Sequence, residues 1–453
     1  MMEKNNILFL IVDSFRSDKF YGDTTKIKNP SINYLIENGT YFSNTISSAD
    51  GTILSWSSIF TGKFPFKTGI RSSKFNRLSS NTKTFFDILE KENYNFYSYL
   101  PKLSETVGLF PKFENNDNYY DFYMGLTNGL GQKILDLKKN GLKEPWFFLI
   151  HSMDLHPPIT IDKQFDNDEN GENYYERKIS EIDPWLNKIS DSIDFSKTLF
   201  IVTADHGSYI KSVMRNGKQI DTNINTNAEM VISKIGKSVP KPFLPLKDKL
   251  FFIREKMDNK KKSKTLKNLK LKPHEMRALM SGRADKDHFL FDDKIKIPLL
   301  LIGKNIPKGK KISQQVRSVD IFPTLFDLMD IKIDEKIDGS SLTNIMNGEV
   351  EDEKIAYIES NPLVLSESND VIGIRTSKYK YFRDKNNSKN RIHLYDLEND
   401  PFEDLNIASS NVNKINEFEQ MLSQIRKDSE NILENDELDS EEIENELRKL
   451  GYV

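Results

Sequence analysis

Short runs of apolar residues recur along the chain, and three of them are followed at once or within three residues by charged or imidazole side chains. The runs occupy residues 6–12, 146–150 and 199–202, and a fourth lies at 297–302. Their length, with many β-branched and aromatic residues, predicts strands that are buried on both faces of a parallel sheet.

Apolar residues at helical spacing separate these strands. Helices are predicted at residues 30–38, 84–90, 130–139, 179–189 and 318–329, and another begins at Thr52 and continues through Phe60. Because strands alternate with helices, the pattern predicts an α/β fold built on a large, mostly parallel sheet flanked by helices.

The pattern changes towards the end of the chain. Short alternating runs at 355–359, 371–376, 379–382 and 393–395 predict a small antiparallel sheet. Residues 413–450 are charged, amphipathic and helical in character. We therefore expect a catalytic domain at 1–345, a small C-terminal α+β subdomain at 346–410 and a helical segment at 411–453.

Residues 208–286 differ from the rest in charge. They contain 20 Lys and Arg against 7 Asp and Glu, a balance of +13 in a chain whose net charge is -3. The segment lacks a strong period, which is typical of an insertion. It is interpreted as a basic insertion or lid, with a plain solvated loop and an anion-steering surface as the two alternatives.

Composition excludes several classes of function. The chain has no cysteine, so it contains no disulfide, thiolate metal site or thiol nucleophile. Its apolar runs are too short to span a bilayer, and its first residues lack the design of a signal peptide. We expect a cytoplasmic protein without a transmembrane segment. The small net charge gives no reason to expect a nucleic-acid partner.

Polar side chains follow three of the predicted strands. Asp13 follows the first strand, Asp154 and His156 follow the second, and Asp205 and His206 follow the third. Open α/β sheets bind ligands at the carboxyl edge of their strands, and two carboxylates with an imidazole can hold a divalent metal. The alternative is a set of turns, in which Asp caps a helix and Gly207 takes a positive φ.

Two further residues complete the inventory for metal-assisted cleavage of an ester. Thr52 stands at the start of a predicted helix, where its hydroxyl is either a helix cap or a nucleophile in the positive field of the helix dipole. His288 follows the basic insertion. Histidines at such a site can neutralise or protonate departing oxygens.

Nearly the whole chain resembles the sulfatase branch of the alkaline phosphatase superfamily. Residues 6–18 (NILFLIVDSFRSD) are similar to the opening strand and D-D-x-R-x-D loop of that family, and residues 203–207 (TADHG) to its S/T-x-D-H-G signature. Similar segments occur in the family's order at 29–42, 61–70, 154–158, 291–303, 318–325, 395–406 and 447–453. The order and spacing of these motifs make the resemblance specific, and it implies an alkaline phosphatase-like fold.

Departures from the family pattern fall on the reactive residue and the metal site. Thr52 stands where sulfatases carry the Cys or Ser that is oxidised to formylglycine, and Thr cannot give that aldehyde by the same conversion. Leu54 and Trp56 replace the Pro and Arg of the sulfatase motif. Ser14 replaces the second Asp of the metal site.

A Thr at this place resembles the phosphoryl-handling members of the superfamily. The resemblance therefore favours cleavage of a phosphate monoester or diester through a covalent Thr52 intermediate, by a hydrolase or a transferase. Implied metal ligands are Asp13, Thr52, Asp205 and His206; implied catalytic residues are Thr52, His156 and His288; implied substrate contacts are Lys102, Lys286 and Asp154.

The implied cofactor is a divalent metal, with Zn²⁺ or Mn²⁺ favoured and Ca²⁺ or Mg²⁺ as alternatives. The expected partner is an anionic ester, such as a modified glycan, a lipid head group or a nucleotide. Two other functions are considered. One is a sulfatase that hydrolyses sulfate esters. The other is a catalytically inactive protein that binds an anion or glycan, which Ser14 and Trp56 would favour.

Overall fold

The computed structural model describes most of the chain up to residue 427. The described residues are 4–21, 26–70, 78–79, 81–120, 123–215, 218–222, 260, 262–264, 266–267, 269–281, 289–360 and 370–427. No helix among them combines the length and apolar character that crossing a bilayer requires.

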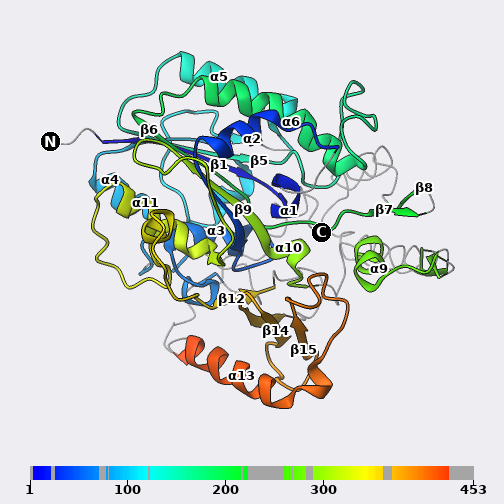
Figure 1. The fold of residues 1–453 in the computed structure, drawn as a ribbon. Helices are drawn as coiled ribbons and strands as arrows, with labels where there is room; N and C mark the ends of the chain where they lie inside the picture. The colour runs from blue at the N-terminus through cyan, green and yellow to red at the C-terminus, as the bar shows by residue number, and fades with distance from the viewer. Residues whose placement is uncertain are drawn as a thin grey trace, which may run out of the picture.

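A nine-stranded sheet runs through the middle of the larger part of the molecule (Figure 1). Its central strands are β9 (Lys296–Ile302), β6 (Thr198–Thr203), β1 (Asn6–Val12), β5 (Trp146–Ser152) and β3 (Asn95–Pro101), in that spatial order. The outer strands are β2 (Thr40–Ile46), β10 (Lys310–Ile312), β11 (Val316–Arg317) and β4 (Tyr119–Tyr120). Among these strands, β9 alone runs antiparallel to its neighbours, so the predicted, mostly parallel α/β sheet is confirmed.

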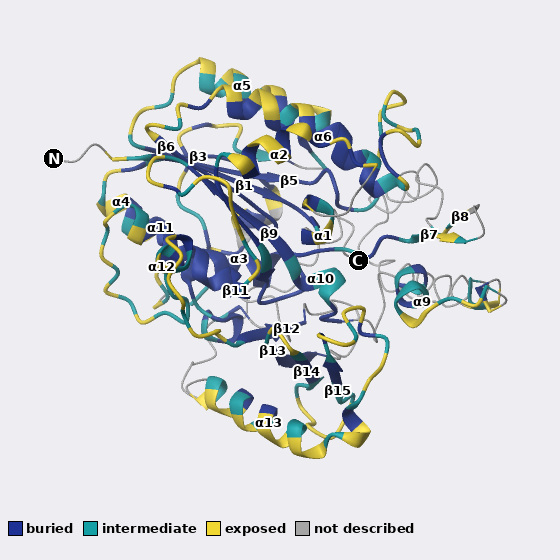
Figure 2. Ribbon diagram, in the orientation of Figure 1, coloured by how far each residue is buried: buried dark blue, intermediate teal, exposed yellow. Residues whose placement is uncertain are grey.

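Helices cover both faces of this sheet. One face is covered by α2 (Pro30–Glu37), α5 (Leu130–Lys139) and α6 (Tyr174–Asp191), and the other by α3 (Thr52–Thr61), α4 (Phe85–Lys91) and α11 (Ile321–Leu328). In β1, Phe9 faces one core and Leu10 the other. Figure 2 shows β1, β5 and β6 buried throughout, as expected for apolar runs sandwiched between two helical layers.

The predicted C-terminal antiparallel sheet is present. Its order is β12 (Ala356–Glu359), β13 (Val371–Arg375), β14 (Tyr379–Asp384) and β15 (His393–Asp396). Helix α13 (Val412–Arg426) packs Phe418 and Leu422 against one face of this sheet. Residues 428–453 of the predicted helical segment lie outside the described residues. The domain boundaries at 345 and 410 stay predictions.

Several elements differ from the predicted ones. Strand β5 continues two residues past the apolar run, through His151 and Ser152. Helix α6 begins earlier than predicted because the Asn173 side chain accepts hydrogen bonds from the backbone of its first turn. Strand β2 is not predicted, because Thr and Asn interrupt its apolar residues.

The remaining described elements are short. They include α1 (Ser17–Phe20), α10 (Asp292–Ile295) and α12 (Thr343–Met346). Within the basic segment 208–286, the described parts form a hairpin of β7 (Ser212–Arg215) and β8 (Lys218–Asp221) and the helix α9 (Pro273–Met280). Most of that segment lies outside the described residues.

A buried ion cluster joins the two sheets. The ammonium of Lys380, on β14, is fully buried and lies 2.5 Å from Asp292 and 2.6 Å from Glu403. Arg375 adds a second cation 2.7 Å from Asp292. Burial raises the pKa of Glu403 to about 6 against the opposing charge of Lys380. The buried Glu403 carboxylate therefore depends on the cation beside it, and the partly buried Asp292 carboxylate does so to a lesser degree.

We predict that Lys380→Met destabilises the protein by about 3–5 kcal/mol, because it leaves the buried Glu403 carboxylate and the partly buried Asp292 carboxylate without their shared cation. The matched control is Lys378→Met, which removes an exposed lysine 3.7 Å from Glu398 and should cost about 0–1 kcal/mol. Urea unfolding of both variants measures the difference. Equal free energies of unfolding would contradict the structural role given to Lys380.

Candidate metal centre and active site

Three neighbouring strands bring acidic and imidazole side chains to one edge of the large sheet. Asp13 directly follows β1, and Asp205 follows the end of β6. His151 lies on β5, in register with Ile11 of β1. Because β6, β1 and β5 are parallel neighbours, these three residues meet at the same carboxyl edge.

Hydrogen bonds to the Oδ1 atom of each carboxylate help to orient it. Asp13 Oδ1 accepts a hydrogen bond from Ser14 Oγ at 2.6 Å. Asp205 Oδ1 accepts hydrogen bonds from the backbone N–H of His206 at 2.8 Å and of Ser14 at 3.3 Å. Ser14 reaches both because its φ is 64°. The Oδ2 atoms of both carboxylates face His151.

His151 completes a cluster that could hold a metal ion. Its Nε2 lies 3.5 Å from Asp13 Oδ2 and 3.5 Å from Asp205 Oδ2. One donor atom from each of the three residues lies within 4.8 Å of the others, and all three side chains are buried. Two carboxylate oxygens and one imidazole nitrogen are suitable donors for a divalent transition metal.

The electrostatic potential inside this cluster is strongly negative. Burial opposes protonation of His151, but hydrogen bonds to Asp13 and Asp205 outweigh it and raise the pKa of His151 to about 9. Burial would raise the pKa of Asp13, but His156, His151 and His206 hold it well below its usual range. The same potential would attract a metal cation.

Thr52 and His206 lie beside this cluster. Thr52 is the first residue of α3, and Gly51, not Thr52, is the capping residue. The Thr52 hydroxyl lies 3.3 Å from Asp13 Oδ2 and 3.3 Å from His206 Nε2. The structure therefore brings together the predicted ligands Asp13, Thr52, Asp205 and His206; their role as ligands stays a prediction.

Hydrogen bonding indicates the tautomer of His206. Its Nδ1 lies 2.8 Å from the carbonyl oxygen of Gly207, which can only accept. We therefore place the proton of the neutral ring on Nδ1, which leaves the Nε2 lone pair directed at Thr52. Gly207 itself is required by close packing, since a Cβ there would lie 2.3 Å from the carbonyl oxygen of Asp293.

The carboxylate of Asp154 is hydrogen-bonded to neighbouring groups of the protein. It accepts hydrogen bonds from the backbone of Leu126 at 2.6 Å, from the Thr127 hydroxyl at 2.7 Å and from the Ser152 hydroxyl at 2.5 Å. The buried ammonium of Lys178 lies 3.5 Å away. These contacts indicate that Asp154 anchors the turn that follows β5. The substrate contact expected of it from the sequence stays a prediction.

The remaining predicted site residues differ in how far the structure locates them relative to the metal cluster. His156 is buried on that turn, with its ring 5.2 Å from the ring of Tyr123, and its charge reaches Asp13. Lys102 is exposed just beyond the carboxyl end of β3. His288 and Lys286 lie outside the described residues. The roles of these four residues stay predictions.

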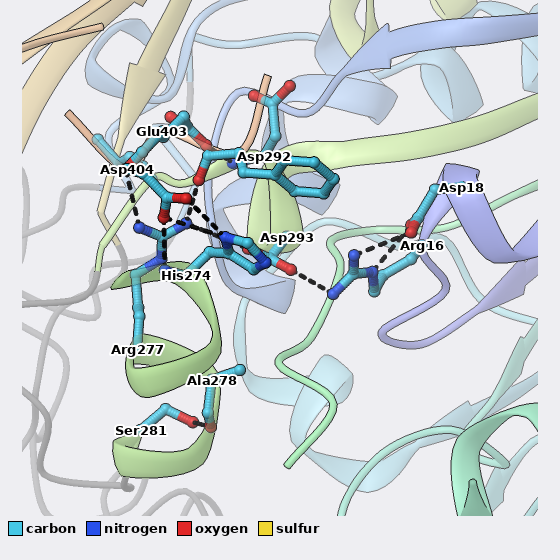
Figure 3. Close-up of polar contacts among 12 residues, drawn as sticks. Arg16, Asp18, His274, Arg277, Ala278, Ser281, Asp292, Asp293, Glu403 and Asp404 are labelled. Atoms are coloured by element: carbon cyan, nitrogen blue, oxygen red, sulfur yellow. Dashed lines mark hydrogen bonds and ion pairs between the residues drawn. The ribbon is translucent and has the colours of Figure 1, made fainter. Parts of the chain in front are cut away.

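Arg16 fixes the loop that carries Asp13 and Ser14. Its guanidinium pairs with Asp18 at 2.8 Å and with Asp293 of α10 (Figure 3). Its backbone N–H donates to the hydroxyl of Tyr175, which in turn donates to the carbonyl oxygen of Ser14 at 2.7 Å. The opening loop is thus held from both sides.

Helix α9 is joined to the same region. Figure 3 shows His274 beside Asp404, with Nδ1 2.9 Å from Oδ2, and Arg277 beside Glu403. Arg277 also lies 3.6 Å from Asp293. A chain of hydrogen bonds and ion pairs therefore runs from the loop after β15 through α9 to the opening loop.

Comparison with known proteins gives a consistent result. The Sulfatase family model matches residues 5–331, more than half of the chain. A second model, for the C-terminal region of N-sulphoglucosamine sulphohydrolase, matches residues 281–431. Arylsulfatase K of Mus musculus is 21% identical over 431 residues, which cover 89% of this chain and 76% of that protein.

Solved structures share the fold. One is a protein in complex with its substrate D-glucosamine-2-N,6-O-disulfate; it has a TM-score of 0.62 and 14% identity, and the match covers 96% of this chain and all of that one. Phosphonate monoester hydrolase of Agrobacterium radiobacter has a TM-score of 0.65 and 14% identity, with coverage of 94% and 96%. At this level of identity, the likeness shows the fold alone.

These findings correct the expectation of phosphate ester cleavage. That expectation was based on Thr52 at the reactive position. It is wrong, because the relatives that align along most of the chain are named as arylsulfatases and the matching family model is that of the sulfatases. The identity of one side chain is a weaker guide to the ester that is cleaved than similarity along the whole chain.

We predict that Asp205→Asn reduces the bound divalent metal well below one ion per chain. The amide keeps the shape of the side chain, but it removes a negative charge and turns either an oxygen or an N–H₂ group towards His151. Metal content after dialysis against trace zinc measures this. Asp117→Asn, at an exposed carboxylate paired with Lys133, is the control. Full metal content in Asp205→Asn would remove this residue from the site.

Proposed function

This chain belongs to the sulfatase family, and from that premise we propose that it hydrolyses sulfate esters carried by an anionic glycan. The observation that carries the proposal is the position of Thr52. Its hydroxyl lies at the start of a buried helix and within 3.3 Å of both Asp13 and His206. Thr52, at the reactive position of the family, thus lies next to the possible metal ligands.

Several features at this edge suit a sulfate group. The N-terminus of α3, a ten-residue helix, carries a partial positive charge and backbone donors that favour an anion. His156 lies close enough to lower the pKa of Asp13, and Lys102 is exposed at the end of β3. The family uses a divalent metal, which when bound would withdraw charge from the sulfate oxygens.

A sulfated sugar is the proposed substrate class. The relative with the bound disulfated glucosamine supports it, as does the match to the C-terminal region of N-sulphoglucosamine sulphohydrolase. The donor set at the edge fits Zn²⁺ or Mn²⁺ better than Ca²⁺ or Mg²⁺, since the latter favour sites made of oxygen atoms alone.

Thr52 is proposed to attack the sulfur atom. The hydroxyl proton has two acceptors within reach, Asp13 Oδ2 and His206 Nε2. As the Thr52 oxygen bonds to sulfur, the bond from sulfur to the sugar oxygen breaks, and the sugar oxygen takes up a proton from His156. Water then attacks sulfur and gives a proton back to His156. The bond from sulfur to the Thr52 oxygen breaks, that oxygen takes back the proton held by Asp13 or His206, and sulfate leaves.

The second step should be the slow one. In sulfatases that carry formylglycine, the aldehyde hydrate expels sulfate by elimination. The Thr52 side chain offers no such route, because its β-carbon carries a methyl group where the hydrate has a second hydroxyl. The same feature favours a second candidate function, a protein that binds a sulfated glycan without turning it over.

We predict that a chromogenic sulfate ester gives a burst of released alcohol of up to one equivalent per chain, followed by slower turnover. A matched phosphate ester should react more slowly. Intact-mass analysis of the quenched protein should show one added sulfuryl group on the peptide that contains Thr52. Faster turnover of the phosphate ester would contradict the proposed substrate class.

Variants of α3 test the role of the hydroxyl. Thr52→Ala should abolish the burst and the adduct, while binding of the sulfated ligand is largely retained. Thr61→Ala makes the same chemical change at the far end of the helix, where the hydroxyl donates to the Ser57 carbonyl, and should keep activity. Binding of sulfated glucosamine by the wild-type protein without any release of sulfate would favour the second candidate.

A further inference from the structure

His151 has no place among the ligands expected from the sequence, yet its ring faces both carboxylates of the candidate metal site. We propose that His151 is a ligand of the metal in this protein and replaces the oxygen donor that is lost where Ser14 stands. The inference rests on the proposed function only in taking this edge of the sheet as a metal site. It further specifies the kind of metal that the site selects.

The hydrogen bonds around His151 indicate where its lone pair points. The hydroxyl of Tyr120 donates to the carbonyl oxygen of His151 at 2.9 Å. The same hydroxyl lies 3.3 Å from His151 Nδ1. Because its single hydrogen is already used, the Tyr120 oxygen can only accept from Nδ1. The neutral ring therefore carries its proton on Nδ1 and directs the Nε2 lone pair at the two carboxylates.

In this neutral form, which the ring must adopt to bind a metal, three electron-rich atoms converge. They are His151 Nε2, Asp13 Oδ2 and Asp205 Oδ2, with Nε2 3.5 Å from each oxygen. His206 adds a fourth, since its Nε2 lone pair is directed to the same side and lies 3.8 Å from Asp205 Oδ2. A cation at their centre would turn this mutual repulsion into attraction.

The surroundings hold the ring of His151 in place. The Trp56 ring meets it edge to face, with centroids 4.8 Å apart and planes at 86°. Strand pairing with β1 fixes the backbone, and Tyr120 fixes the Nδ1 side. An imidazole that is oriented by an outer hydrogen-bond partner is the usual arrangement of a metal-binding histidine.

Ser14 has a different task from the Asp that it replaces. Its hydroxyl donates to Asp13 Oδ1, and its backbone N–H donates to Asp205 Oδ1. It therefore orients two ligands and offers the metal no charge of its own. The result is a site with two carboxylates and two imidazoles, which favours Zn²⁺ or another nitrogen-preferring metal over Ca²⁺.

Metal titrations of purified wild-type protein, stripped of metal beforehand, test the selectivity. Zn²⁺ should bind more tightly than Ca²⁺ by about 100-fold or more, because Ca²⁺ requires six to eight oxygen ligands and two imidazoles take the place of oxygens here. Binding of Ca²⁺ as tight as that of Zn²⁺ would overturn the inference.

Variants of His151 test the ligand itself. Loss of an outer partner already costs roughly 10–100-fold in metal affinity, so His151→Asn should weaken zinc binding by more than about 100-fold. His151→Asp restores an oxygen donor and should narrow the ratio between zinc and calcium affinities. The control is His393→Asn, at a strand histidine whose Nδ1 lies 3.0 Å from the Tyr395 hydroxyl, and it should leave zinc affinity unchanged.

A second readout does not depend on affinity. In the cobalt-loaded protein, the visible absorption bands report the number and kind of ligands, and they should change in His151→Asn but not in His393→Asn. If His151→Asn fails to fold, Tyr120→Phe keeps the histidine and should still weaken zinc binding by roughly 10–100-fold. Unchanged zinc affinity in Tyr120→Phe or in a folded His151→Asn would overturn the inference.

These outcomes separate the inference from the proposed function. A protein that binds zinc through His151 but releases no sulfate from any sulfated sugar would support the ligand and contradict the hydrolase. A protein that releases sulfate and binds zinc equally well without His151 would support the hydrolase and contradict the role of His151 as a ligand.

Discussion

The placing of two buried carboxylates beside each other is the constraint on which the site depends. Asp13 and Asp205 are both fully buried, and the same imidazole lies 3.5 Å from an oxygen of each. Two such charges in a region of low dielectric constant repel each other strongly unless a cation lies between them. The surrounding structure reduces this repulsion in two ways. Hydrogen-bond donors at fixed positions bind Oδ1 of both carboxylates, and Oδ2 of both faces the imidazole of His151.

The position of the two carboxylates depends on the topology of the whole sheet. The carboxylates come from β1 and β6 and the imidazole from β5, so the site exists only when the three strands pair in register. Arg16 ties the loop after β1 to the region around α10, which the ion cluster at Lys380 joins to the C-terminal sheet. Regions far apart in the sequence thus support the position of a few oxygen and nitrogen atoms.

Much of this could be predicted from the sequence, because buried parallel strands have a distinct apolar pattern. That pattern alone places Asp13, Asp205 and His206 at one edge of the sheet. It fails for His151, because a polar residue after an apolar run looks like the end of a strand, whereas pairing with β1 continues through it. It also gives no sign of two donors to Asp154, Leu126 and Thr127, which come from a short 3-10 helix more than 25 residues earlier in the chain. Partners of that kind leave no periodic signal.

The central claim is that one metal ion lies among Asp13, Asp205, His151 and His206, next to Thr52. The most direct test is a crystal structure of the zinc-loaded protein with anomalous data at the zinc edge. We predict one strong anomalous peak about 2.0–2.2 Å from Nε2 of both histidines and from an oxygen of each carboxylate. The absence of a peak at this edge of the sheet, or a peak that excludes Asp13 and Asp205, would contradict the account.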